Sequence, residues 1–136
     1  MENTEFRVEL VRLVDESYPV VVGRGLEGSV AEFLADKHPD RRAAVITDSN
    51  VASLAAEGLL SSFGSRPAEL VVFPAGEASK TREVKERVED ELIARGFGRD
   101  TVIVALGGGV VTDLAGFVAA TFTRGVPYVS LTTTLL

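Results

Sequence analysis

The sequence predicts an α/β protein in which helices flank a mostly parallel sheet, with an antiparallel pair of strands at the N-terminal end. Two observations lead to this prediction. Short apolar strands alternate with amphipathic helical stretches from residue 26 onward, which is the pattern of βαβ units. One of these strands runs directly into three consecutive glycines and then into a helical stretch. With 136 residues, the chain is long enough for one domain with its own core.

The N-terminal strand pair is predicted from two short stretches. Residues 6–10 alternate apolar and polar side chains, as a half-exposed strand does, and residues 11–14 could extend it. A turn-like break at residues 15–17 separates them from a second strand at residues 18–23. We expect the two strands to pair as an antiparallel hairpin or as an extension at the edge of the main sheet.

The remaining elements follow from apolar periodicity. The predicted strands are residues 43–47, 68–73, 101–106 and 128–131, and the predicted helices are residues 26–35, 51–63, 79–95 and 110–120. In the second helix, the apolar face is expected to hold Val51, Leu54, Ala55, Leu59 and Phe63, and Gly64 is placed to end it. In the third helix, Lys85/Glu89 and Arg87/Glu91 are expected to be exposed ion pairs.

The carboxyl ends of these strands carry small, polar or glycine residues. The ends are residues 47–50, 74–77, 107–109 and 132–134. Ligands of open parallel sheets bind outside the carboxyl ends of the strands, which meet at one edge. Four such ends together predict a site for an extended ligand of dinucleotide size.

The triple glycine at residues 107–109 is the strongest local signal in the chain. A glycine loop between a strand and a helix presents backbone N–H groups to a phosphate at the helix N-terminus. The competing interpretation is a tight turn without a ligand. A single glycine would suffice for such a turn, so the run of three favours a ligand loop.

Composition excludes several other functions. The net charge of −6 argues against a nucleic-acid partner, and no apolar run is long enough for a membrane span. The acidic, polar start is not a signal peptide, and the absence of cysteine rules out disulfides and thiolate metal sites, so we expect a cytoplasmic protein. His38, the only histidine, is expected to be a solvated loop residue, so a three-ligand zinc site is not predicted.

Five ordered motifs make the chain resemble a known family. They are TDSNV at residues 47–51, PAGEASKT at 74–81, GGGVVTDLAGF at 107–117, TRG at 123–125 and TTLL at 133–136. In order and spacing they are similar to the N-terminal, NAD-binding part of 3-dehydroquinate synthases, in the sugar-phosphate cyclase superfamily. Thr112 departs from this pattern, in which glycine is usual, and Thr132 stands where proline is usual. The resemblance implies a Rossmann-like domain over residues 1–136.

The resemblance also implies roles for individual residues. Asp48 and Asn50 would lie near the adenosine of NAD, and Glu77 and Lys80 would contact its ribose and phosphate side. Gly108, Gly109 and Val110 would offer backbone groups to the pyrophosphate, and Asp113 would hydrogen-bond toward the nicotinamide half. Thr133 and Thr134 would line the cofactor cleft, and Arg124 would reach the phosphate of the substrate.

Each of these residues has a purely structural alternative. Asp48 would cap the helix that follows it, and Asp113 would be an acid favoured by the dipole of its helix. Glu77 and Lys80 would be solvated helix ends. Thr133 and Thr134 would be ordinary strand residues, and Arg124 a surface charge in a turn.

For the whole enzyme, the resemblance implies a lyase of the shikimate pathway, which leads to aromatic amino acids. It would convert 3-deoxy-D-arabino-heptulosonate 7-phosphate to 3-dehydroquinate and phosphate, with NAD and a divalent metal, zinc or cobalt. In the family, further cofactor and substrate lysines follow the TTLL motif, together with a mostly helical second domain that carries the metal ligands. We therefore expect this chain to be a truncated domain, inactive alone, that forms a homodimer through exposed apolar surface on its last strand and helix.

Two other functions remain open on the sequence. One is the nucleotide-binding half of a metal-dependent alcohol or glycerol dehydrogenase, which has a similar glycine loop before an aspartate-bearing helix. The other is a non-catalytic nucleotide-binding module. The TRG motif and the Glu77–Lys80 spacing favour the synthase over the dehydrogenase.

Overall fold

The computed structural model describes residues 3–8 and 17–134 of the chain. The proposed strand extension at residues 11–14, most of the break at 15–17 and the last two residues of the TTLL motif lie outside the described residues. Among the helices described, none is both long and apolar enough to cross a lipid bilayer.

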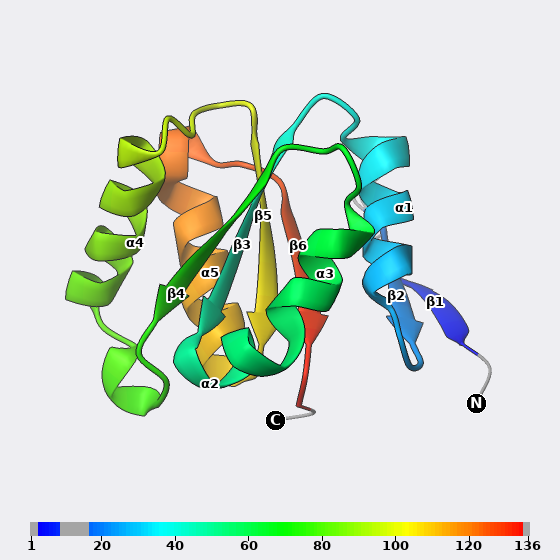
Figure 1. Cartoon of the computed structure of the whole chain (residues 1–136), viewed down its shortest axis with the longest axis horizontal. Coiled ribbons are helices and arrows are strands. Elements are labelled where there is room, and N and C mark those ends of the chain that lie inside the picture. Colours follow the sequence, from blue (N-terminus) through cyan, green and yellow to red (C-terminus); the bar gives the residue numbers. More distant parts are fainter. Residues whose placement is uncertain (1–2, 9–16, 135–136) are drawn as a thin grey trace.

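Within the described residues, the predicted strands form a four-stranded, fully parallel sheet in the order β4-β3-β5-β6. These are β3 (Arg42–Asp48), β4 (Ala68–Phe73), β5 (Thr101–Gly107) and β6 (Tyr128–Thr132). All four agree with the predicted strands to within one residue at each end. Their carboxyl ends lie together at the lower edge of the sheet in Figure 1.

Helices cover both faces of this sheet, as predicted. The helices α1 (Glu27–Lys37) and α3 (Glu57–Ser62) pack on one face, and α4 (Arg82–Ala94) and α5 (Gly109–Thr121) pack on the other (Figure 1). A hydrophobic core lies on each face of the sheet. Alternate side chains of β3 pack into these two cores, with Val45 on the α1–α3 side and Ile46 on the α4–α5 side. A strand buried on both faces is continuously apolar, which is the pattern that the sequence shows.

The chain changes direction between β3 and β5. From β3 it passes over one face to β4, and it then returns over the other face through α4 to β5, on the far side of β3. Thr47, which is fully buried, holds this junction, because its Oγ1 donates a hydrogen bond to the carbonyl of Leu106 at 2.6 Å. Ligands of open α/β sheets bind at such a switch point.

The N-terminal strands form a hairpin of their own. The strands β1 (Thr4–Val8) and β2 (Tyr18–Val22) pair antiparallel as a separate two-stranded sheet beside α1. The antiparallel pair is confirmed, and of the two expected arrangements the structure has the hairpin.

The second helix differs from its prediction. It begins earlier, at α2 (Ser49–Val51), and passes through a π-helical turn, η1 (Ala52–Ala56), before α3. Leu54 was placed on the buried face, and this is wrong, because its side chain is 84% exposed. A π turn inserts an extra residue into the helical ladder, which rotates the positions within it away from a regular 3.6-residue face.

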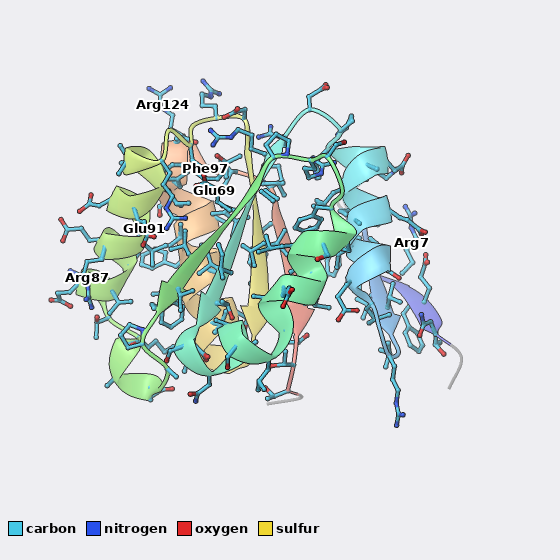
Figure 2. The ribbon with its side chains drawn as sticks, in the orientation of Figure 1. Arg7, Glu69, Arg87, Glu91, Phe97 and Arg124 are labelled. Carbon is cyan, nitrogen blue, oxygen red and sulfur yellow. The ribbon has the colours of Figure 1, made fainter. Side chains whose placement is uncertain are left out.

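The third helix begins later than predicted. The 3₁₀ turn η2 (Glu77–Ser79) precedes α4, and Thr81 caps α4 by accepting a hydrogen bond from the N–H of Val84 at 3.2 Å. The Lys85–Glu89 ion pair is confirmed at 2.7 Å, but both side chains are half-buried rather than exposed. The predicted ion pair between Arg87 and Glu91, both labelled in Figure 2, is wrong, since Glu91 pairs with Arg95 instead. Arg95 also donates a hydrogen bond to the carbonyl of Leu70 in β4.

Candidate functional site

The carboxyl edge of the sheet brings most of the predicted site residues together. In the register of the sheet Thr47 pairs with Leu106, so the following Asp48 lies beside Gly107. After β6, the N–H of Thr133 donates to the carbonyl of Gly107 at 3.0 Å. The two segments that follow β3 and β6 therefore flank the glycine loop.

The three consecutive glycines have different surroundings. A Cβ on Gly107 would lie 2.6 Å from Cγ2 of Val111, so no side chain fits there. A Cβ on Gly108 would lie 3.0 Å from Oγ1 of Thr134, which places Thr134 directly against the loop. A Cβ on Gly109 would meet no described atom within 4 Å. The described structure explains Gly107 and Gly108, whereas Gly109 opens onto free space.

The N-terminus of α5 offers unused hydrogen-bond donors. Gly108 is its N-cap, and no described side chain caps it. The first helical hydrogen bond runs from the N–H of Thr112 to the carbonyl of Gly108 at 3.0 Å, so the N–H groups of residues 109–111 have no partner within the helix. By contrast, α2 and α4 are capped by the side chains of Asp48 and Thr81. Backbone donors at an uncapped helix N-terminus suit an anion.

Asp48 caps the helix that follows it, which was the structural alternative to binding the cofactor. Its Oδ1 accepts hydrogen bonds from the N–H groups of Asn50 and Val51, both at 2.9 Å. The side chain of Asn50 is exposed beside it. The cap occupies one oxygen of the carboxylate, and no described hydrogen bond involves Oδ2 of Asp48. The same residue can therefore cap α2 and bind a ligand.

An exposed cluster of charges joins the loop after β4 to α5. The Nζ of Lys80 lies 2.6 Å from Oδ2 of Asp113 and 3.8 Å from Oε1 of Glu77. The hydrogen bond and the charge of Asp113, followed by the charge of Glu77, raise the pKa of Lys80 above its ordinary value. Asp113 thus has a partner beyond the helix dipole, and Lys80 is tied across the edge of the sheet.

Two residues near the loop were not singled out by the sequence. The hydroxyl of Tyr128 donates to the carbonyl of Thr112 at 2.9 Å, which ties β6 to α5, and partial burial raises the pKa of that hydroxyl. The Oγ of Ser49 accepts a hydrogen bond from the N–H of Ala75 at 2.9 Å, which joins the loops after β3 and β4. Both contacts depend on which strands are neighbours, which no local pattern reveals.

Arg124 lies at the other edge of the sheet. It follows the C-terminus of α5, whose 13 residues span about 20 Å, and Figure 2 shows it opposite the carboxyl ends of the strands. Thr123 and Arg124 both have positive φ angles, 48° and 71°, which turn the chain sharply there. The structure therefore does not bring Arg124 together with the other predicted site residues of the same chain.

The donor groups for a metal ion do not come together in this part of the protein. Among the residues that the structure describes, no three His, Cys, Asp or Glu side chains are grouped so that they could hold a metal ion. At the carboxyl edge, Asp113 pairs with Lys80, and one oxygen of Asp48 caps α2.

Replacing single glycines by alanine should distinguish Gly107, which packing requires, from Gly109, which faces open space. We expect Gly107→Ala to lower the free energy of unfolding by about 2 kcal/mol or more, because its Cβ collides with Val111 in a tightly packed helix start. Gly109→Ala should change the free energy of unfolding by no more than about 0.5 kcal/mol, or raise it slightly. Urea denaturation measures both, and equal losses in the two variants would contradict this assignment.

The ion pair of Lys80 should be visible in its titration. Asp113→Asn should lower the pKa of Lys80 toward its ordinary value, and Glu77→Gln should lower it less, because Glu77 is the more distant partner. Since the pKa is raised in the folded state, the stabilisation from this pair is present below the ordinary pKa of lysine and is lost as the pH rises through the folded value. NMR titration of the side-chain Cε signal of Lys80, in the original chain and in each variant, measures these changes. A larger effect of Glu77→Gln than of Asp113→Asn would show that Asp113 is not the main cause of the raised pKa of Lys80.

Comparison with known proteins places the chain in a family. Residues 70–136 match the family described as 3-dehydroquinate synthase N-terminal. A 3-dehydroquinate synthase from Methylococcus capsulatus is 44% identical over 126 residues, which cover 93% of this chain and 35% of the relative. A 2-epi-valiolone synthase from Stigmatella aurantiaca is 41% identical, with 98% of this chain and 34% of the relative covered. The chain thus spans about a third of the length of the curated relatives that it matches.

The fold leads to the same group of proteins. A crystal structure of 2-deoxy-scyllo-inosose synthase, complexed with carbaglucose-6-phosphate, NAD+ and Co2+, matches with a TM-score of 0.84 at 26% identity. The match covers 96% of this chain and 35% of that one. In motifs, sequence identity and fold alike, the chain belongs to the 3-dehydroquinate synthase N-terminal family.

Proposed function

We propose that this chain binds NAD at the carboxyl edge of its sheet and forms the cofactor-binding part of a 3-dehydroquinate synthase. The observation that carries the proposal is the uncapped N-terminus of α5 beside Gly109, at the switch point between β3 and β5. Free N–H donors, open space and a position at the switch point are the three things that a bound pyrophosphate needs. The solved structure of 2-deoxy-scyllo-inosose synthase with NAD+ supports this choice of ligand.

Each residue at the edge then has a role in holding the cofactor. The N–H groups of Gly109 and Val110, with the backbone of Gly108, bind the pyrophosphate. On the β3–β4 side, the adenosine lies near Asp48 and Asn50. The ribose and the phosphate side are contacted by Glu77 and Lys80. Asp113 faces the nicotinamide half, and Thr133 and Thr134 form the wall against the loop. Asp48 contributes the carboxylate oxygen that the cap leaves unused.

The chemistry follows from what the residues of this chain can do. NAD, when bound, supplies reversible hydride transfer, and the chain binds and orients it. Lys80 is pre-positioned by Asp113 and Glu77, so a phosphate or ribose oxygen meets an ammonium group that is already fixed. The described residues do not fit a divalent metal, so we propose that the metal ligands of the enzyme, and its substrate-binding domain, belong to a longer protein.

The relatives include both 3-dehydroquinate synthases and a 2-epi-valiolone synthase. We propose the 3-dehydroquinate reaction, with release of phosphate, because the identity to the Methylococcus capsulatus enzyme is 44%. A cytoplasmic homodimer remains part of this proposal. Arg124 is too far from the glycine loop of its own chain, so a contact with the substrate phosphate requires Arg124 from a second copy.

Binding of NAD+ is the direct test. Isothermal titration should show saturable but weak binding to this chain, because its described residues form only one wall of the proposed cleft. Gly109→Ala should weaken it about tenfold or more by placing a methyl group where the pyrophosphate lies, and Asp113→Ala should also weaken it. Gly28→Ala in α1, which likewise meets no described atom within 4 Å, is the matched control. Unchanged affinity in a folded Gly109→Ala variant would refute the proposed phosphate site.

Turnover should separate binding from catalysis. This chain alone should release no phosphate from 3-deoxy-D-arabino-heptulosonate 7-phosphate, with or without zinc or cobalt, because its described residues cannot hold the metal. A longer protein containing the chain should be active. A phosphate-release assay, run beside a mock purification that controls for host enzyme, measures this. Metal-dependent release by the purified chain would overturn the expectation.

A further inference from the structure

A groove at the opposite edge of the sheet has no role in the proposed function. It has a volume of about 590 Å³ and lies where α1 and α3 meet the loops that lead into β3 and β4. These loops lie at the upper edge of the sheet in Figure 1, away from the glycine loop. Three arginines contribute to its lining, namely Arg41, Arg42 and Arg66.

The groove holds half-buried arginines without carboxylate partners. Nη1 of Arg41 donates to the carbonyl of Thr101 at 2.9 Å, and Nη1 of Arg66 donates to the carbonyl of His38 at 2.9 Å. No acidic side chain in the described residues forms an ion pair with either. A guanidinium has five N–H donors, and no described hydrogen bond uses Nη2 or Nε of Arg41 or of Arg66. Both heads are fixed by backbone carbonyls and keep donors for a ligand.

The third arginine, Arg42, is also held without a carboxylate partner among the described residues. Its guanidinium lies 4.2 Å from the ring centroid of Phe97 and donates to the carbonyl of Gly96 at 2.8 Å. Phe97 belongs to the core on the α4–α5 side, so the positive charge of the groove on the α1–α3 side comes from Arg41 and Arg66, which stay charged at every physiological pH. The chain as a whole carries a net charge of −6, so this edge differs from the average surface.

The pKa of His38 responds to the positive charge of the groove. Partial burial and then the charges of Arg41 and Arg66 lower the pKa of its imidazole. Glu32 and Asp40 also line the groove, but both are exposed, and neither forms a described ion pair with an arginine. The local field on His38 is therefore set by the arginines.

We propose that this groove binds a small anion carrying several charged oxygens, of the phosphate or polycarboxylate type, through the guanidinium groups of Arg41 and Arg66. Fixed guanidinium forks suit such oxygens, and their anchoring by carbonyls lowers the ordering cost of binding. The proposal does not depend on NAD binding, because the groove and the glycine loop lie at opposite edges of the sheet.

Titration of the chain with inorganic pyrophosphate tests the proposal, with potassium chloride at matched ionic strength as the reference. His38 is the only histidine, so its ring signals are identified at once by NMR. Saturable shifts in His38 and in the amides of residues 39–42 and 66 are expected, together with a rise in the pKa of His38. Shifts confined to residues 107–110, or shifts that only follow ionic strength, would overturn the proposal.

Variants locate the binding groups. Arg41→Gln and Arg66→Gln should each weaken the apparent affinity about tenfold or more, and Arg66→Lys, which keeps the charge but loses the fork, should fall in between. Arg87→Gln, an exposed arginine on α4, should bind as the original chain does. If Arg41→Gln does not fold, Arg66→Lys and the titration of the original chain decide. Unchanged affinity in folded variants of Arg66 would overturn the proposal.

Discussion

The pairing of β3 with β5 is the constraint on which the rest of the structure depends. Both strands are buried on both faces, so each must present apolar side chains in both directions along most of its length. Because β4 and β6 lie outside this pair, the connections must leave it in opposite directions, and a crevice opens at its carboxyl end. The register of the pair then places Asp48 beside the glycine loop, with Thr47 fixing the junction from inside.

Much of this arrangement could be predicted from the sequence, because buried parallel strands and amphipathic helices leave clear periodicities. The strands of the sheet and the antiparallel pairing of the two N-terminal strands were predicted correctly, and the predicted cofactor residues share one edge, whereas Arg124 lies at the other. The exposure of Leu54 could not be predicted, since a π turn depends on how the helix packs and has no recognisable periodicity in the sequence. Glu91 has an arginine four residues away on each side, and the choice of Arg95 over Arg87 could not be predicted, because Arg95 is held in place by its contact with β4.

The glycine loop shows how structure refines a motif. In the sequence, three glycines form one signal, and their number alone suggested a ligand. In the structure, Gly107 is required by the packing of Val111, and Gly108 lies against Thr134. Only Gly109 opens onto space that the described chain does not fill. The evidence for a ligand therefore rests on a single glycine and on the uncapped helix that follows it, rather than on the length of the run.

The charges of the two edges have a consequence for the response to salt. Asp48, Glu77 and Asp113 outnumber Lys80 at the carboxyl edge, so an anion there would be held mainly by the dipoles of backbone N–H groups at short range. The opposite edge has charged guanidinium groups in a half-open groove. Mobile ions screen full charges at a distance far more than they screen short hydrogen bonds. Raising the ionic strength would therefore weaken anion binding at the arginines while leaving the glycine loop nearly unaffected.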